Sequence, residues 1–396
     1  MQLDYTLQQS LNKRFVMKRS GGYIQQSSGY KAFIPSPLPP DPALQFSKNL
    51  PKILSQSDRA LARLDSLGDI LPNVDLFIAM FVRKEAVLSS QIEGTQASLE
   101  DLFQYESGQS PEKVNDVDEV VNYIKALNYG MERLDSLPMS NRLIKEIHEV
   151  LLKGVRGASK TPGEFKRTQN WIGPPGSTLA DASFVPPPPH DATKAMGELE
   201  KYLHHESEYP VLINCALIHY QFETIHPFLD GNGRLGRLLI TFYLYWKDIL
   251  HKPLLYLSYF FKKNRQEYYD RLTMVRNSGN YEQWIEFFLK GVTEVSDLAI
   301  DTAKKILELQ SDHRNQLWQK KMSSPLAVGL LEKLFYTPYM SVKNVSQAFS
   351  ISYQAASMLV NQFEKHGILM EITGKKRDKM YVYKQYIDIL SEGTRS

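Results

Sequence analysis

The stretch IHPFLDGNGRLGR, residues 225–237, joins a loop with two glycines to the start of an apolar helix. Its two arginines, Arg234 and Arg237, fall in the first turn of that helix and share one face because they are three residues apart. Cationic side chains are unfavourable there, since unpaired N–H groups and the backbone dipole already make a helix N-terminus positive. The sequence therefore predicts that an anion binds at these arginines.

The neighbouring residues supply the other parts of a phosphate site. Gly231 and Gly233 let backbone N–H groups approach an anion closely, and Asn232 adds a side-chain amide. Asp230 offers a carboxylate of the kind that Mg2+ takes together with phosphate oxygens and water. His226 can accept a proton from an incoming hydroxyl near neutral pH. Together these residues predict transfer of a phosphorus-centred group to a hydroxyl.

The motif HPFLDGNGRLGR resembles the signature of Fic-domain proteins, HxFx(D/E)GNGRxxR, at every specified position. The resemblance implies an all-helical fold and transfer of AMP from Mg-ATP to a Ser, Thr or Tyr hydroxyl of a target protein, with release of pyrophosphate. On the family's assignments His226 is the general base and Asp230 binds Mg2+. Asn232 and the glycines form the anion hole, and Arg234 and Arg237 contact the outer phosphates.

A second anion is carried by the same chain. The segment SSQIEG, residues 89–94, resembles the family's inhibitory motif, (S/T)xxxE(G/N), in the class whose inhibitory helix precedes the signature. The resemblance implies that Glu93 pairs with Arg237 and keeps the γ-phosphate from binding productively, because both anions need the same guanidinium. Ser89 would fix the helix that delivers Glu93, and Gly94 completes the motif. The alternative is a solvated glutamate before a glycine C-cap.

The segment NWIGPPGSTLADASFVPPPPH, residues 170–190, interrupts the helical pattern with two short extended pieces. It resembles the family's β-hairpin flap, which holds the target by main-chain pairing. A plain surface loop is the alternative, although an excursion of this length in a helical domain is more often functional. The predicted flap residues are Trp171, Ile172, Gly173, Phe184 and Val185.

Periodicity divides the chain into four parts. Residues 1–110 are expected to hold an arm, irregular to about residue 41, and the helices with the inhibitory motif. Residues 111–300 are the expected Fic catalytic domain, and residues 301–324 a helical linker. Residues 325–396 are the expected winged-helix domain. The predicted fold class is all-α, with a Fic-type helical domain, a short β-hairpin flap and a C-terminal winged helix-turn-helix domain.

The C-terminal part has the pattern of a winged helix: two helices, a turn, a recognition helix ending at Gly367 and a two-stranded wing over residues 368–386. Nine basic and six acidic residues lie between Pro325 and Ser396, which accounts for the net charge of +3. The wing tip could therefore contact DNA phosphates, and a protein-interaction module is the alternative. The candidate contacts are Lys375, Lys376, Arg377 and Lys379.

The whole chain has the composition of an ordinary globular protein, with 396 residues and 42% hydrophobic content. Its single cysteine, Cys215, lies in an apolar run, so we expect a buried thiol and a reducing cytoplasm. No apolar stretch approaches the roughly 18 residues that a spanning helix needs, so neither membrane insertion nor export is expected. The expected partners are ATP with Mg2+ and a target protein, with DNA and a second copy of the chain as further candidates.

Three other functions fit the same residues. One is a DNA-binding regulator in which the Fic body senses nucleotide, but sensing alone would not require His226. A second is a Fic enzyme that also removes AMP from modified proteins, with Glu93 orienting a water molecule. A third is transfer from another nucleotide or from a phosphocholine donor, since the motif recognises phosphates before it recognises a base.

Overall fold

The computed structural model describes residues 19–109, 111, 113–174 and 176–392, so the first 18 residues of the predicted arm lie outside the described part. The described residues are mostly helical, as predicted. The helices before the C-terminal part are α2 (Leu50–Ile70), α3 (Val74–Ile92), α4 (Leu99–Glu106), α5 (Val114–Leu134), α6 (Asn141–Leu151), α7 (Pro189–His204), α8 (Val211–Ile225), α9 (Asn232–Trp246), α10 (Ser258–Lys263), α11 (Arg265–Ser278) and α12 (Tyr281–Gln319).

Helices α8 and α9 form the centre of the molecule. Every residue of α8 from Leu212 to Ile225 is buried, and so are most of α9 and the thiol of Cys215, as predicted. A helix that is apolar on all sides belongs in the interior, where α8 contacts α7 and α12 and α9 contacts α5 and α6. The loop between α8 and α9 is thereby held between buried helices.

Side-chain caps mark the starts of two of these helices. Ser98 begins α4 with a capping box, in which its side chain accepts from Asp101 N and the Asp101 carboxylate accepts from Ser98 N. Ser140 begins α6 by accepting from Leu143 N. Helix α6 ends at Leu151, and Gly154, shortly after it, has a φ of +72°.

The arm was predicted to be irregular to about residue 41, but it contains two strands. Strands β1 (Gly21–Gln25) and β2 (Lys31–Pro35) form an antiparallel hairpin, with Tyr23 opposite Phe33. Each strand has only five residues, too few for alternation to stand out against the glycines and serines around them. Phe33 N donates to Val185 O at 2.9 Å, which joins the hairpin to the predicted flap.

The C-terminal part follows the predicted order, with additions. It contains α13 (Pro325–Tyr336), α14 (Val342–Phe349), α15 (Tyr353–Lys365) and α16 (Lys384–Ser391), and the strands β3 (Tyr339–Ser341), β4 (Met370–Glu371) and β5 (Met380–Val382). The sheet has the antiparallel order β3-β5-β4, so β3 joins the two expected wing strands. The wing was predicted to continue to residue 386, but β5 ends at Val382 and α16 follows.

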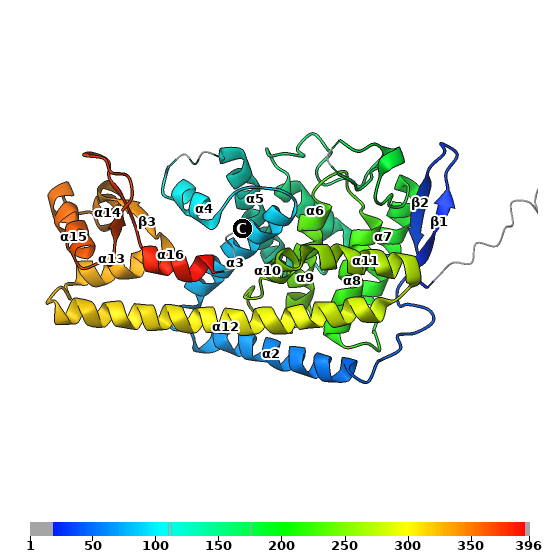
Figure 1. Cartoon of the computed structure of the whole chain (residues 1–396), viewed down its shortest axis with the longest axis horizontal. Coiled ribbons are helices and arrows are strands. Elements are labelled where there is room, and N and C mark those ends of the chain that lie inside the picture. The colour runs from blue at the N-terminus through cyan, green and yellow to red at the C-terminus, as the bar shows by residue number, and fades with distance from the viewer. Residues whose placement is uncertain (1–18, 110, 112, 175, 393–396) are drawn as a thin grey trace, which may run out of the picture.

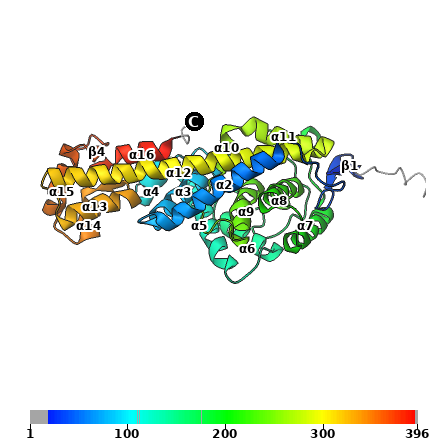
Figure 2. The same cartoon turned by 90° about the horizontal axis from the view of Figure 1, so that it is seen from below.

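The long helix α12 connects the two ends of the molecule (Figures 1 and 2). It packs along α2 and also contacts α13 and α16 of the C-terminal part. It passes through residue 300 without a break, so the expected boundary between catalytic domain and linker falls within one helix. Among the described residues, no helix combines the length and the apolar character needed to cross a membrane.

Candidate functional site

The loop that carries the signature turns sharply at both ends. His226 ends α8 in the left-handed conformation, with a φ of +48°, and its N–H donates to Phe222 O at 2.9 Å. Gly231 begins α9 with a φ of +75°, where a β-carbon would lie 3.3 Å from Leu152 Cδ2. A left-handed residue at each end places both His226 and the first turn of α9 at one edge of the buried helices.

Two asparagines fix the backbone of this loop. Asn232 Oδ1 accepts from Phe228 N at 2.9 Å, and its Nδ2 donates to Phe228 O at 2.8 Å. Asn170, from the segment before the flap, donates to Phe228 O at 2.7 Å and to His226 O at 3.0 Å. The side chain of Asn232 was expected to face an anion; here both ends of its amide hold the loop.

Lys166 is a residue that the sequence did not single out. It is buried, and its Nζ donates to His226 O at 3.1 Å and to Asn170 Oδ1 at 2.6 Å. Burial lowers the pKa of the Lys166 amine to about 7. Lys166 therefore holds the main chain of His226 and leaves the imidazole of this predicted base without a bond to it.

His148 supports Asp230 in a similar way. Gly163 N donates to His148 Nδ1 at 2.9 Å, so Nε2 carries the proton and donates to Asp230 O at 2.9 Å. The imidazole also stacks on Phe228, with ring centroids 3.7 Å apart. Burial lowers the pKa of His148 to about 4, so this ring stays neutral. No motif marks His148 in the sequence, because its partners come from two distant loops.

The imidazole of His226, the predicted general base, is neutral. Burial, together with the nearby positive Lys166, lowers the pKa of His226 to about 3, although Glu93 acts in the opposite direction. Its Nδ1 is buried and has no hydrogen-bond partner within the described residues. A neutral imidazole with an unused nitrogen can accept a proton.

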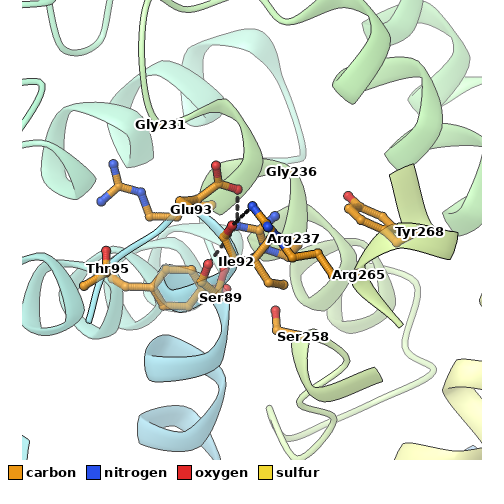
Figure 3. Close-up of polar contacts among 12 residues, drawn as sticks. Ser89, Ile92, Glu93, Thr95, Gly231, Gly236, Arg237, Ser258, Arg265 and Tyr268 are labelled. Atoms are coloured by element: carbon orange, nitrogen blue, oxygen red, sulfur yellow. Dashed lines mark hydrogen bonds and ion pairs between the residues drawn. The ribbon is translucent and has the colours of Figure 1, made fainter. Parts of the chain in front are cut away.

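The predicted pair of Arg237 and Glu93 is present (Figure 3). Arg237 Nη2 donates to Glu93 Oε1 at 2.7 Å and to Ser89 O at 3.0 Å, and its Nε donates to Ser89 Oγ at 2.8 Å. Glu93 ends α3 directly before Gly94, whose φ is +95°. The inhibitory motif and the second arginine of the signature are therefore in direct contact.

Glu93 also lies against the first turn of α9. A β-carbon on Gly233 would overlap the Glu93 carboxylate, so the close approach requires glycine at that position. Burial acts to raise the pKa of Glu93, but the Arg237 guanidinium outweighs it and the pKa lies below its ordinary value. Glu93 is ionised near neutral pH and occupies the side of the arginine that an outer phosphate would need.

Arg234 has a different partner. It is buried, and its Nη1 donates to Glu119 Oε2 at 2.8 Å, while its Nη2 lies 3.6 Å from Asp230 Oδ1. Its Nε has no hydrogen-bond partner in the described part of the chain. Glu119, on α5, was not singled out in the sequence because it lies on a helix whose only visible pattern is an apolar stripe.

Family models match most of the region that builds this site. Residues 52–132 match the model described as "Fic/DOC family N-terminal", and residues 138–244 match the one described as "Fic/DOC family". Two segments of the chain are thus similar to the two parts of the Fic/DOC family. The first match contains the inhibitory motif, and the second contains the flap and the signature.

Named relatives and solved structures agree with this assignment. The chain is 29% identical over 253 residues to "Protein adenylyltransferase Fic" of Culex quinquefasciatus, covering 60% of this chain and 46% of that protein. It is 28% identical over 260 residues to the same-named protein of Drosophila ananassae, covering 62% and 48%. The chain thus spans about half the length of these curated relatives.

Two Fic structures show the same fold. A Fic family protein from Desulfovibrio desulfuricans aligns with a TM-score of 0.57 at 19% identity, over 86% of this chain and 97% of that one. A Fic-domain-containing signaling protein from Bacteroides thetaiotaomicron aligns with a TM-score of 0.51 at 20% identity, over 65% and 97%. At identities this low, the alignments support a shared fold and nothing more about function.

The flap of this Fic domain is minimal. Ile172 and Phe184 form a single antiparallel bridge, with Ile172 N donating to Phe184 O at 2.8 Å and Phe184 N to Ile172 O at 3.1 Å. Phe184 and Val185 are buried, whereas Trp171 is 41% exposed. Because Val185 O already accepts from Phe33 N of β2, the segment with Trp171 and Ile172, followed by Gly173, is the open side of the predicted flap.

Asp230 is the one predicted metal ligand of the Fic motif. Its side chain is 35% exposed, and its Oδ1 accepts from Gly231 N at 2.6 Å. Among the described residues, no three His, Cys, Asp or Glu side chains gather where they could share a metal. A single accessible carboxylate beside two arginines fits Mg2+ held jointly by protein, phosphate and water, and it does not fit a closed all-protein metal site.

Proposed function

We propose that this Fic protein transfers AMP from Mg-ATP to a Ser, Thr or Tyr hydroxyl of a target protein, or of itself, and is restrained by its own Glu93. The observation that carries the proposal is the 2.7 Å ion pair between Glu93 and Arg237, located beside a neutral imidazole with an unused nitrogen. A cytoplasmic location and a homodimer stay predictions from the sequence.

The chain's own residues account for the reaction. The target hydroxyl oxygen attacks the α-phosphorus of ATP, the bond from that phosphorus to the bridging oxygen breaks, and pyrophosphate leaves. His226 accepts the hydroxyl proton, while Lys166 and Asn170 hold its main chain in place. Arg234 and Arg237 stabilise the charge that builds on the leaving phosphates. Mg2+ held by Asp230 would neutralise part of the same charge.

The same geometry explains restraint. Arg237 already uses Nη2 for Glu93 and Nε for Ser89, so an outer phosphate must displace the glutamate to reach the guanidinium. Charge-assisted hydrogen bonds of this kind contribute roughly 1.5–3 kcal/mol each, which corresponds to about a tenfold to hundredfold penalty on productive binding.

Replacing Glu93 tests the proposal. Glu93→Gly should raise AMP incorporation by about tenfold or more, because Arg237 becomes available to the γ-phosphate. Glu93→Gln, which keeps the shape and removes the charge, should act in the same direction. His226→Ala should abolish incorporation in both backgrounds. The measurement is label transfer from [α-32P]ATP, with mass spectrometry to identify the adduct.

Unchanged α-phosphate transfer in Glu93→Gly would contradict the restraint. An adduct other than AMP would favour the other donors considered above. Release of AMP from a premodified substrate by the wild-type chain, lost in Glu93→Gly, would instead favour hydrolytic removal of AMP with Glu93 orienting the attacking water.

We also propose that the C-terminal module binds duplex DNA. A cleft of about 480 Å3 lies between α14, the wing and residues 107–109 after α4, with Lys343, Lys375 and Lys379 on its lining and one acid, Asp378. The exposed residues at the start of α15, Tyr353 and its neighbours, carry no acidic side chain that would repel phosphates. Lys343 on α14 and the wing lysines lie on the same cleft as Tyr353 at the polar start of α15. Basic side chains around a polar helix start suit binding to a phosphate backbone.

A mobility shift with random duplex DNA tests this second proposal. Binding should weaken steeply as salt rises and should be lost in the triple variant Lys375→Ala, Lys376→Ala and Arg377→Ala. The matched control is Lys304→Ala, on the exposed face of α12 away from the wing. No shift at low salt would favour a protein partner for the module.

A further inference from the structure

Glu119 receives more polar contacts than the proposed reaction explains. It is only 2% exposed. Its Oε2 accepts from Arg234 Nη1 at 2.8 Å, from Thr95 Oγ1 at 3.2 Å and from Arg156 Nη2 at 3.2 Å, and its Oε1 pairs with Arg156 Nε at 3.1 Å. One buried carboxylate thus joins three segments that are far apart in the sequence.

The contact with Arg234 fixes the first arginine of the signature. Buried charges need close partners, and Glu119 lies nearer to Arg234 than Asp230 does. Because Glu119 holds Nη1, the plane of the guanidinium is set and its Nε donor remains unused. An arginine oriented in advance loses little freedom when a phosphate arrives.

The contact with Thr95 holds the inhibitory segment. Thr95 is buried two residues after Glu93, and its N–H donates to Ser90 O at 3.2 Å. Its hydroxyl is bound to Glu119, and the next residue, Gln96, donates its N–H to Asp116 Oδ2 at 2.7 Å. Neighbouring Cα atoms are about 3.8 Å apart, so fixing Thr95 limits how far Glu93 can withdraw from Arg237 (Figure 3).

The contact with Arg156 reaches the other side of the site. Arg156 lies in the loop after α6, with 55% of its side chain exposed, and binds both oxygens of Glu119. The next residue is Gly157, where a β-carbon would lie 3.0 Å from Asp230 Oδ2. Glu119 therefore anchors the loop that packs against the predicted metal ligand.

We infer that Glu119 is a positioning residue that couples the inhibitory segment to the nucleotide site. Its carboxylate orients Arg234 for phosphate and, through the Thr95 hydroxyl, holds the segment that carries Glu93 against Arg237. This inference rests on the proposed function for its link to activity, but its two structural contacts can be tested without turnover.

The Thr95 contact is tested by hydrogen exchange. Thr95→Val keeps the shape and removes the hydroxyl, and Thr95→Ser is the matched control that keeps it. Since a hydrogen bond to a charged group is lost, amides of residues 92–97 should exchange about tenfold faster in Thr95→Val and near the wild-type rate in Thr95→Ser. AMP incorporation should rise with Thr95→Val in the wild-type background and stay unchanged in the Glu93→Gly background, where restraint is already absent.

The Arg234 contact is tested by binding. In a Glu93→Gly, His226→Ala background, which should not turn over, Glu119→Gln should weaken Mg-ATP binding by about tenfold as measured by calorimetry. Equal exchange in Thr95→Val and wild type, or equal Mg-ATP affinity with and without Glu119→Gln, would overturn the coupling. If Glu93→Gly transfers no AMP, the proposed activity is overturned. The hydrogen-exchange and calorimetry measurements would still test the coupling through Glu119. If Glu119→Gln fails to fold, the comparison of hydrogen exchange in Thr95→Val and Thr95→Ser still tests the coupling.

Discussion

At the scale of single residues, the site keeps the imidazole of His226 neutral. Burial and the positive charge of Lys166 hold the pKa of His226 at about 3, far below the ordinary value of about 6.5. Lys166, with a pKa of about 7, becomes more fully charged as the pH falls and disfavours protonation of the imidazole further. Glu93 is the facing carboxylate that acts in the other direction, and the activating substitution removes it.

The expected consequence is a flat pH–rate profile on the acid side. Because His226 stays unprotonated until the pH approaches 3, AMP incorporation by Glu93→Gly should not fall through loss of the base between pH 8 and about 5.5. The measurement is the initial rate at saturating Mg-ATP and constant ionic strength. A decline with a midpoint near 6.5 would show an imidazole that titrates as in water.

At the scale of elements, local sequence patterns predicted the helices and loops whose structure is set by residues close together in the sequence. The signature predicted the order of loop and helix after His226, and the structure has α8, the loop and α9 in this order. The motif around Glu93 predicted a contact with Arg237 that spans 144 residues, because a family resemblance carries information that periodicity does not. The interruption of the helical pattern predicted two extended pieces, and the structure has a single bridge between Ile172 and Phe184 there.

Contacts between distant elements could not be predicted in the same way. Glu119 binds an arginine 115 residues later, and Lys166 binds a carbonyl 60 residues later. Buried charged residues on amphipathic segments look like solvated ones until packing brings their partners together. Hairpin β1–β2 was missed because its strands are short and gain stability from the flap edge at Val185.

At the scale of the whole molecule, the C-terminal module holds the helix that delivers Glu93. Tyr336 OH donates to Asn73 Oδ1 at 2.8 Å, and this oxygen also caps the start of α3. Near the middle of α3, buried Lys84 donates to Glu392 O at 3.1 Å and lies 4.8 Å from the centre of the Tyr256 ring. The C-terminal module is thus bonded directly to both the start and the middle of α3.

Lys84 makes this junction sensitive to pH. Burial lowers the pKa of its amine to about 8, and the nearby Glu392 offsets only part of that effect. Between pH 8 and the unfolded value of about 10.4, the unfolded chain binds more protons than the folded one, so stability rises with pH in that window. Below pH 8 both states are charged, and the folded state bears the full cost of the buried ammonium.

Lys84→Met removes the charge and keeps much of the length, so its stability should not follow this titration. The free energy of unfolding of the wild-type chain should therefore rise relative to that of Lys84→Met as the pH increases from 7 to 9.5. This relative increase should approach a total of about 3 kcal/mol only near pH 10.4. Urea unfolding at four pH values measures the difference. Lys304→Met, whose lysine is 63% exposed on α12, corrects for the general effect of losing a surface lysine. A difference between wild type and Lys84→Met that does not change with pH would mean that the amine is hydrated and that α16 does not seal it against α3.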